Sequence, residues 1–387
     1  MNWWNLFLFA LLIAGHTQLW VSLINRLHSL ALPHAILRHS RHVHDAAILG
    51  FPLLLIWFSG VTGPRLLIDG RWSEVSAAWM AIMCLCAAGC IGLMIGIVRY
   101  QWRSTPPALL AEQSSIIDIE RHLGRRPVGV GPYQSLAKFP WNEQFTVEIT
   151  EKRLALPRLP LAWQGLRILH LSDWHLLPTI EREYFEAVTI LVRDEPVDLV
   201  VFTGDLIDDM ACVEWLPSTL GQLDAPLGRY FILGNHDWVQ GAETIREHVS
   251  SHGWRSVGST VETIEHLGHR MAIAGDETPW LGSRPKIEQT SDVDFRLLLS
   301  HTPDHFRWAQ QKEVDLMLSG HNHGGQVVLP VMGPVYSPSS QGVRYAAGTF
   351  EQSSTVMHVS RGLAGRHPLR WRCRPEVTRL ILERGSS

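Results

Sequence analysis

The sequence has few cysteines and no surplus of positive charge. Its 387 residues include five cysteines, and three of them, Cys84, Cys86 and Cys90, lie in one apolar run. No two form a Cys-x-x-Cys pair, so a thiolate zinc module is excluded and a disulfide framework has no support. The formal net charge of -3 lacks the basic excess of a nucleic-acid-binding chain. We therefore expect no nucleic acid partner, and any metal ligands must be imidazole, carboxylate or amide groups.

Long apolar runs occur in the first part of the chain, where they cover Trp3–Asn25, Ala46–Val61 and Val75–Val98. A helix that spans a bilayer needs about 20 apolar residues. The third run fits best, the first fits well, and the second is short. Residues 1–103 are therefore predicted to form a membrane region with two to three transmembrane helices. A cleaved signal peptide is the alternative for the first run, which lacks the basic start and small-residue cleavage site of such a peptide.

Arginines beside these runs predict the orientation of the chain in the membrane. Arg26, Arg38 and Arg41 lie in the first loop, Arg99 and Arg103 follow the third run, and the second loop holds Arg65 and Arg71. Membrane-flanking loops rich in Lys and Arg stay in the cytoplasm. Three spans therefore place the N-terminus outside and the second half of the chain in the cytoplasm. With only two spans, the second half lies on the other side.

Two polar stretches follow or interrupt the apolar runs. The first loop holds five histidines, which are His28, His34, His39, His42 and His44. We expect a polar loop at the lipid headgroups, with a metal site as the alternative. Residues 104–143 mix proline, glycine and charge and are predicted to be a linker. Alternating apolar residues predict a strand over Gln144–Ala155 that opens a catalytic domain over 144–387, and helical spacing predicts a helix over Ile180–Arg193.

Five short polar blocks in the second half each follow an apolar run that is typical of a buried strand. The runs are Leu166–Leu171, Val197–Phe202, Tyr230–Leu233, Phe295–Leu299 and Val314–Leu318. The blocks are Asp173-Trp174-His175, Gly204-Asp205, Gly234-Asn235-His236-Asp237, Ser300-His301 and Gly320-His321-Asn322-His323. Such strands end together at one edge of an α/β sheet, where ligands bind. Two Asp, one Asn and three to four His are too many ligands for one metal ion and predict a site for two.

The residue types suit a dinuclear metal site. Residues i and i+2 of a strand point to the same face, so Asp173 and His175 can bind one ion. Asp205 has two carboxylate oxygens and can bridge two ions that lie roughly 3.5–4 Å apart. Asn235 supplies a neutral oxygen, which limits the negative charge around the pair. The remaining positions are filled by His301, His321 and His323. The ions can be Mn, Fe, Zn, Mg or Co, because all of these accept such ligands.

The order D-x-H, G-D, G-N-H-D, S-H and G-H-x-H over roughly Leu166–Val327 resembles the calcineurin-like metallophosphoesterases. The resemblance implies an α/β fold of the α+β sandwich type, with two mixed β-sheets flanked by helices. It implies that one metal is held by Asp173, His175, Asp205 and His323, and the other by Asp205, Asn235, His301 and His321. It also implies two catalytic residues: His236 beside the phosphate, where it stabilises charge and helps to protonate the leaving group, and Asp237, which orients the His236 imidazole.

A longer match resembles one bacterial, membrane-associated branch of this superfamily. It includes Gly320-His321-Asn322-His323-Gly324-Gly325-Gln326 and the tail around Val359–Gly362, Pro368–Arg370 and Pro375–Val377. Some members of that branch hydrolyse the pyrophosphate of UDP-2,3-diacylglucosamine. The resemblance therefore predicts a multi-pass enzyme of the bacterial inner membrane that hydrolyses a phosphodiester or pyrophosphate, with a lipid-linked small molecule as its substrate. The alternative is a non-catalytic regulatory or binding domain on a membrane sensor or transporter. A metallo-β-lactamase-type hydrolase needs an H-x-H-x-D-H cluster, which this chain lacks.

Three pairs of residues near the blocks have two interpretations each. For Asp208 and Asp209, a position in a solvated turn or a helix cap is favoured over hydrogen bonding to the metal ligands. Lining of the substrate entrance and packing under the loops are equally consistent with Trp174 and Trp238. Binding of a second phosphate and plain surface exposure are equally consistent with Arg361 and Arg366.

Overall fold

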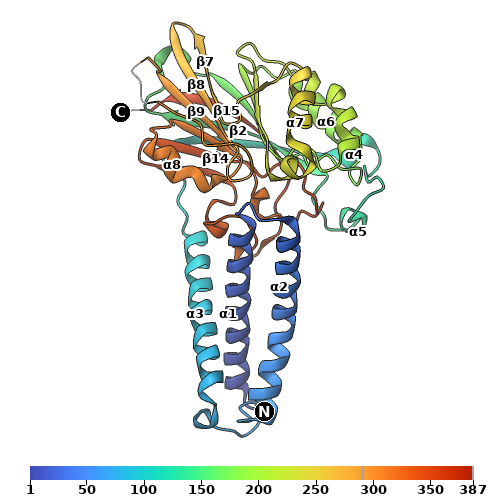
Figure 1. The fold of residues 1–387 in the computed structure, drawn as a ribbon, viewed down its shortest axis with the longest axis vertical. Helices are drawn as coiled ribbons and strands as arrows, with labels where there is room; N and C mark the ends of the chain where they lie inside the picture. Colours follow the sequence, from blue (N-terminus) through green and yellow to red (C-terminus); the bar gives the residue numbers. More distant parts are fainter. Residues whose placement is uncertain (289–291, 386–387) are drawn as a thin grey trace. The chain divides into compact units, whose positions relative to one another are not determined.

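The computed structural model describes residues 1–288 and 292–385 and divides into two compact units (Figure 1). The helical unit comprises Met1–Arg103 and Leu329–Gly342. The sheet unit comprises Ser104–Val328 and Val343–Ser387. The helical unit thus contains the region expected in the membrane, but it also takes a segment from the domain expected over 144–387.

The helical unit is built on three long helices, α1 (Trp3–His28), α2 (His34–Leu55) and α3 (Ala77–Gln101), and α1 packs against the other two. Among the described residues, these three are long and apolar enough to cross a membrane. The second exceeds its predicted length because α2 begins at His34, well before Ala46, and η1 (Ile56–Thr62) continues it to Thr62. The candidate span therefore covers Ala35–Thr62.

The predicted polar loop of five histidines was wrong, because four of these residues lie in α2. Histidine and arginine do not break a helix, and polar turns at a helix end can lie outside an apolar layer. The Nδ1 atom of His39 lies 2.6 Å from the Ala35 carbonyl oxygen of its own helix, so this side chain has a hydrogen-bond partner within α2. The candidate span therefore begins among polar residues that hydropathy alone assigns to a loop.

The segment Leu329–Gly342 is bound within the helical unit by side chains of α1 and α3. The Asn25 amide donates to the Val335 carbonyl at 3.4 Å and accepts from the Ser337 N–H at 3.2 Å. Gln101 donates to the Val331 carbonyl. These contacts satisfy backbone groups of a segment that has little regular structure of its own, including the buried N–H of Ser337.

The sheet unit contains two mixed β-sheets, as the family resemblance predicted (Figure 1). In spatial order, the seven-stranded sheet has β1 (Leu109–Asp118), β2 (Thr146–Leu156), β15 (Glu376–Arg384), β3 (Arg167–Leu171), β4 (Leu199–Thr203), β5 (Arg229–Ile232) and β6 (Arg255–Ser256). The six-stranded sheet has β13 (Gly348–Gln352), β14 (Thr355–Val359), β10 (Leu316–Ser319), β9 (Phe295–Ser300), β8 (His269–Asp276) and β7 (Val261–His266). The strands β3, β4 and β5 are parallel, as are β9 and β10. All five predicted strands before the polar blocks are present.

Alternation along the strands separates the apolar core into layers. Ile168 of β3 packs between the sheets, while Leu169 and Leu171 pack on the other face, under the helices α6 (Arg182–Arg193) and α7 (Asn235–Ser251). The six-stranded sheet is covered on its outer face by α8 (Phe306–Gln311). The predicted helix over 180–193 is α6, which begins two residues later.

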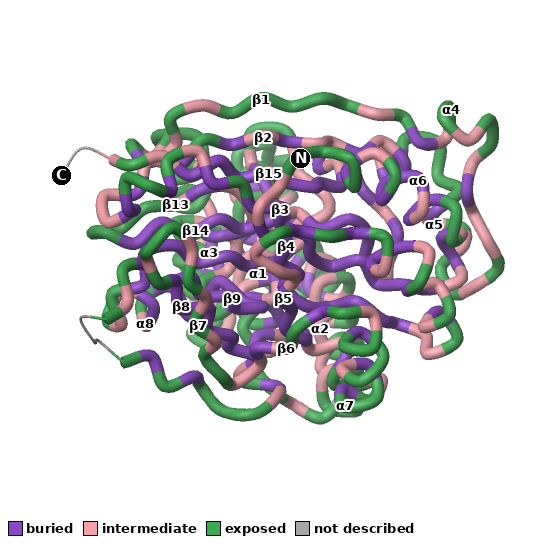
Figure 2. Tube along the Cα trace, turned by 90° about the horizontal axis from the view of Figure 1, so that it is seen from above, coloured by how far each residue is buried: buried purple, intermediate pink, exposed green. Residues whose placement is uncertain are grey.

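The expected linker over 104–143 is instead part of the sheet unit. It contains β1, which pairs along β2 in antiparallel register, and the short helices α4 (Ile119–Leu123) and α5 (Gln134–Ala137). Figure 2 shows β1 as a mostly exposed strand beside the buried strands. An edge strand with solvent on both faces has little apolar alternation, and the sequence pattern therefore did not reveal it.

Candidate metal centre

Each polar block lies directly after its strand, at the carboxyl ends of β3, β4, β5, β9 and β10. Five of the predicted ligands have a left-handed backbone, with φ of 52° for Asp173, 46° for His175, 57° for Asp205, 69° for His321 and 49° for His323. This conformation costs roughly 1–2 kcal/mol for a residue with a Cβ. Such strain concentrates at functional sites, where the surrounding structure imposes it. Here it turns the ligand side chains toward one another.

The first cluster contains the side chains of Asp173, His175, Asp205 and His323, whose ligand atoms lie within 4.8 Å of one another. The Nε2 atoms of His175 and His323 are 3.2 Å apart. Asp173 Oδ1 lies 3.6 Å from His323 Nε2, and Asp205 Oδ2 lies 3.5 Å from His175 Nε2. Ligand atoms that share one ion at about 2.1 Å lie roughly 3.4 Å apart. The spacing therefore suits a single divalent ion.

The second cluster contains Asp205, His301 and His321, again within 4.8 Å. His301 Nε2 lies 3.1 Å from His321 Nδ1 and 3.1 Å from the side-chain oxygen of Asn235. Asp205 Oδ2 is 3.3 Å from His301 Nε2, and the same oxygen faces His175 of the first cluster. Asp205 is thus the residue that both clusters share.

Three of the imidazole rings have a hydrogen-bond acceptor beside the ring nitrogen that faces away from the cluster centres. The Nδ1 atoms on their outer sides face hydrogen-bond acceptors: Asp208 at 3.2 Å for His175, the Thr203 carbonyl at 2.7 Å for His301 and the Ala364 carbonyl at 3.1 Å for His323. An Nδ1–H that donates outward leaves Nε2 with its lone pair, as in metal-binding histidines. The donor set of imidazole, carboxylate and amide, together with this ring order, fits two divalent cations.

Charges within the site shift several pKa values. Burial alone lowers the pKa of His236, but the carboxylates of Asp208 and Asp205 outweigh it and raise this pKa to about 10. Burial alone raises the pKa of Asp205, but the surrounding imidazoles hold it well below its usual value. Burial and the neighbouring His175 hold the pKa of His323 well below 6.5. His236 therefore carries a proton at neutral pH, and His323 is a neutral ring that is ready to bind a metal.

The orienting contact that was expected from Asp237 is made by Asp208. Asp208 Oδ1 lies 2.5 Å from His236 Nδ1, and its other oxygen faces His175. Asp237 accepts hydrogen bonds from the backbone N–H groups of Gly234, Leu206 and Ile207. A carboxylate surrounded by backbone donors holds the loops after β4 and β5 together rather than turning the imidazole.

Asp208 is therefore buried between His175 and His236, whereas the sequence analysis favoured a solvated turn or helix cap for it. Its neighbour Asp209 does cap a helix, since it accepts from the Ala211 N–H at the start of η4 (Met210–Ser218). Adjacent identical residues thus have different contacts, and the signal that distinguishes them is the position of His236 in the first turn of α7.

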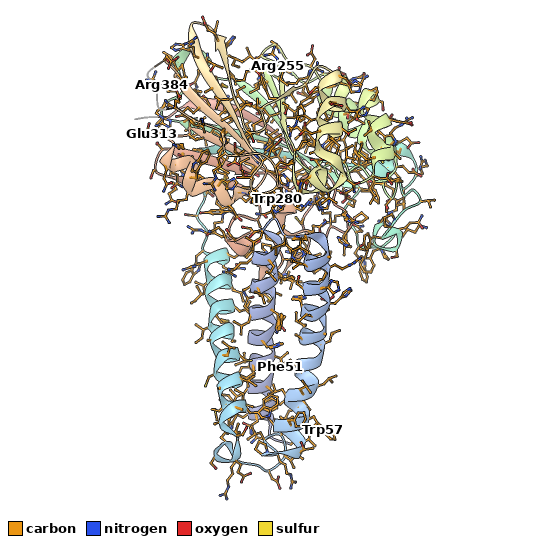
Figure 3. All side chains as sticks on the ribbon, in the orientation of Figure 1. Phe51, Trp57, Arg255, Trp280, Glu313 and Arg384 are labelled. Atoms are coloured by element: carbon orange, nitrogen blue, oxygen red, sulfur yellow. The ribbon has the colours of Figure 1, made fainter. Side chains whose placement is uncertain are left out.

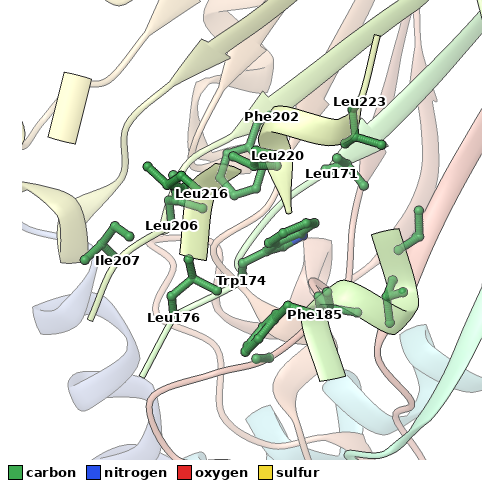
Figure 4. Close-up of a cluster of buried hydrophobic side chains, with 14 of the residues drawn as sticks. Leu171, Trp174, Leu176, Phe185, Phe202, Leu206, Ile207, Leu216, Leu220 and Leu223 are labelled. Carbon is green, nitrogen blue, oxygen red and sulfur yellow. The ribbon is translucent and has the colours of Figure 1, made fainter. Parts of the chain in front are cut away.

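Aromatic residues around the site are divided between packing and exposure. Trp174 is 1 % exposed and packs against Phe185 and Phe202 (Figure 4), so it packs under the loops rather than lining an entrance. Trp238 is 38 % exposed. Trp280, which is labelled in Figure 3, was not predicted: its ring centroid lies 4.9 Å from that of His321 and 5.6 Å from that of His301.

The two arginines of the tail loop also differ from each other. Arg361 bonds Glu376 through Nε at 3.0 Å and Glu148 through Nη2 at 3.0 Å. Its charge is therefore already paired with two carboxylates, and it is neither a plain surface residue nor a free phosphate ligand. Arg366 is partly exposed, and its positive charge acts on the His236 imidazole.

Comparison with known proteins gives a consistent family assignment. Residues 166–325 match the model of the family described as calcineurin-like phosphoesterase. The chain is 33% identical over 251 residues to the uncharacterized metallophosphoesterase YkuE of Bacillus subtilis, which covers 62% of this chain and 87% of YkuE. It is 30% identical over 224 residues to the phosphodiesterase YaeI of Escherichia coli, covering 56% of this chain and 82% of YaeI. It is 24% identical over 289 residues to the UDP-2,3-diacylglucosamine pyrophosphatase LpxG of Chlamydia muridarum, covering 60% and 88%.

Proposed function

Because this chain belongs to the calcineurin-like metallophosphoesterase superfamily, we propose that it is a membrane-anchored hydrolase of a phosphodiester or pyrophosphate with two divalent metal ions. The observation that carries this proposal is the position of Asp205 Oδ2, 3.5 Å from His175 Nε2 and 3.3 Å from His301 Nε2. One carboxylate between two imidazole clusters is the arrangement that a dinuclear centre requires. The complete ligand set supports an enzyme over a non-catalytic regulatory domain.

The chemistry assigns separate tasks to the residues of the site. The first ion would be held by Asp173, His175, Asp205 and His323, and the second by Asp205, Asn235, His301 and His321. Two such ions neutralise the charge of a phosphoryl group and make water a strong nucleophile at neutral pH. The His236 side chain is 24% exposed, whereas that of Asp208 behind it is 1% exposed. His236 therefore faces the substrate and donates its proton to the leaving oxygen.

The substrate that we propose is a lipid-linked phosphoester, with UDP-2,3-diacylglucosamine as the sharpest candidate. Two observations support it: three helices long and apolar enough to cross a membrane, and the similarity to LpxG. Tethering an enzyme in the bilayer raises its effective concentration toward a substrate in the same bilayer. The tail around Val359–Gly362, which resembles the bacterial membrane-associated branch, agrees with this assignment.

We expect the full-length enzyme in detergent–lipid micelles with Mn²⁺ to hydrolyse UDP-2,3-diacylglucosamine with a higher kcat/KM than bis(p-nitrophenyl) phosphate. The reason is that only the lipid-linked molecule is concentrated in the micelle beside the enzyme. Product formation is measured by mass spectrometry for the lipid and by absorbance for the nitrophenyl ester. If only the soluble ester were hydrolysed, the proposal of a lipid-linked substrate would be wrong, whereas the proposal of phosphoesterase activity would remain supported.

We further propose that the protein lies in the bacterial inner membrane with its N-terminus outside and its sheet unit in the cytoplasm. Three candidate spans support this orientation. So do the arginines at one end of these helices, with Arg26 in the last turn of α1, Arg38 and Arg41 in the first turns of α2, and Arg99 and Arg103 at the end of α3 and just after it. Alkaline phosphatase fused to the C-terminus is expected to be inactive, and green fluorescent protein fused there is expected to fluoresce. The reverse pair of results would place the sheet unit on the outer side.

A further inference from the structure

The layer between the two sheets holds a row of buried polar side chains at its end nearest the metal centre. Most of this layer is apolar, with residues such as Ile168, Val201 and Leu380. Along the same strands and faces, however, stand Lys152, His170, Ser172, Thr203, His358 and Glu376, each of which is at most 2 % exposed. Burying polar groups is unfavourable unless they are hydrogen-bonded to one another. Such a row therefore needs a physical reason.

The row begins at the metal ligand Asp173 and leads away from it. The Ser172 hydroxyl lies 2.5 Å from Asp173 Oδ2, and the Thr203 hydroxyl lies 2.8 Å from Ser172 Oγ. Thr203 Oγ1 in turn lies 2.9 Å from His170 Nε2. The first three links thus join strand β4 to strand β3 behind the first metal cluster.

The row continues across the gap between the sheets and ends on a charge. His170 Nδ1 lies 2.9 Å from His358 Nδ1, which belongs to β14 of the other sheet. His358 Nε2 lies 3.3 Å from Lys152 Nζ. The ammonium group of Lys152 is also 3.3 Å from Glu376 and 3.6 Å from Glu112 on the edge strand β1. Five hydrogen bonds therefore connect a buried lysine to a metal ligand.

The positions of the protons can be derived from the carboxylate end. An ionised Asp173 can only accept, so Ser172 uses its single proton on Oδ2. Ser172 must then accept from Thr203, which uses its own single proton in that bond. Thr203 must therefore accept from the Nε2–H of His170. A neutral imidazole with a proton on Nε2 has a bare Nδ1.

The same order results from the lysine end. An ammonium group can only donate, so His358 Nε2 accepts from Lys152 and the proton of that ring lies on Nδ1. This proton is donated to the bare Nδ1 of His170. Burial lowers the pKa of His170 to about 3 and, with the nearby Lys152 charge, holds the pKa of His358 well below 6.5. Both rings are therefore neutral, and all five bonds point in one direction, from Lys152 to Asp173.

We propose that this row of hydrogen bonds, from Lys152 to Asp173, is a relay that positions Asp173 as a metal ligand. The positive charge of Lys152 strengthens the relay. The Ser172 hydroxyl donates to Oδ2 of Asp173, beside the His321 N–H at 3.1 Å. Oδ1, which also accepts from the His321 N–H at 3.0 Å, is directed at the first cluster, 3.6 Å from His323 Nε2 and 3.9 Å from His175 Nε2. A charge-assisted donor at the far end polarises each bond in the chain. The residues Lys152, His358, His170 and Thr203 thus act on the metal through Asp173 without contacting it.

The test compares two substitutions at Thr203 in the full-length protein. Thr203→Val keeps the shape but removes the hydroxyl, whereas Thr203→Ser keeps the hydroxyl. Both keep the backbone carbonyl that faces His301. Mn²⁺ affinity is measured by calorimetry on chelator-treated protein, so the readout does not depend on turnover. We expect Thr203→Val to weaken the tighter Mn²⁺ site by about 10–100-fold, as loss of an outer partner of a ligand does, and Thr203→Ser to restore wild-type affinity.

A second comparison tests whether the lysine acts along the same row. Lys152→Met removes the charge, and Glu376 remains paired with Arg361 at 3.0 Å. We expect Lys152→Met to weaken Mn²⁺ binding. The double variant Lys152→Met/Thr203→Val is expected to bind Mn²⁺ as tightly as Thr203→Val alone, because Thr203→Val already breaks the link between Lys152 and Asp173. Circular dichroism of the metal-free proteins verifies that each variant is folded.

Three results would overturn the relay: wild-type affinity in Thr203→Val, equal losses in Thr203→Val and Thr203→Ser, or multiplying losses in the double variant. The inference rests on the proposed dinuclear centre. The Mn²⁺ titration of the wild-type protein distinguishes failure of the relay from failure of the centre. Wild-type protein that binds no Mn²⁺ would overturn the centre itself, whereas the variant comparisons test the relay alone.

Discussion

Replacing Asp205 with alanine is expected to remove both metal ions and to lower turnover by more than about 10⁴-fold, since both charge stabilisation and water activation depend on them. The reason is geometric. Asp205 Oδ2 is the oxygen that faces His175 in one cluster and His301 in the other. In Asp205→Ala each cluster loses a ligand. Both clusters also lose the negative charge of Asp205 that would balance the positive charge of the metal ions.

The measurement is metal content by mass spectrometry, together with the shift of the melting temperature when Mn²⁺ is added. A ligand that binds the folded state stabilises it by mass action, so the wild type is expected to melt higher with Mn²⁺ and Asp205→Ala is not. Asp209→Asn is the matched control, because it removes a negative charge from the same loop but keeps the acceptor that caps η4. Full activity or full metal content in Asp205→Ala would contradict the dinuclear assignment.

The positions of the metal ligands could be predicted because local signals determine them. The apolar run Val197–Phe202 became β4 (Leu199–Thr203), and the first polar side chain after the following glycine is Asp205. Parallel strands deliver such residues to one edge regardless of the details of packing. The same logic places His301 after β9, in the other sheet. Sequence order does not give the strand order, however, and the insertion of β15 between β2 and β3 had no local signal.

The supporting residues could not be predicted, because tertiary contacts determine their roles. Asp208 and Asp209 are neighbours with the same chemistry, and only the packing of the first turn of α7 against their loop makes Asp208 a partner of His236. His170 is one of two polar residues in the run Leu166–Leu171, with Arg167 at its start, and alternation cannot say that the face of His170 is buried against a second sheet. The edge strand β1 lacks apolar periodicity because it is exposed on both faces. The segment Leu329–Gly342 has little regular structure, and its partners in α1 lie far away in the sequence.

Replacing His236 with alanine is expected to leave both metals bound and to lower kcat by about 10²–10⁴-fold, which is the usual range for a general acid. Asp208 and Asp205 raise the pKa of His236 to about 10 against the effect of burial, so the ring carries a proton throughout the neutral range. Removing it eliminates the proton donor and a positive charge beside the phosphoryl group. The measurements are kcat with a phosphodiester substrate and metal content.

His248→Ala is the matched control, since it removes an exposed histidine from the same helix, α7, and is expected to keep full activity. Asp208→Asn gives a companion result with a defined sign. Without the Asp208 charge the pKa of His236 falls, so the protonated ring is lost at a lower pH and the alkaline limb of kcat moves toward neutrality. Loss of metal in His236→Ala would instead make His236 a ligand, because His175, Asp208 and His236 also lie close enough to hold an ion. Retained metal with lost turnover separates proton donation from metal binding within one site.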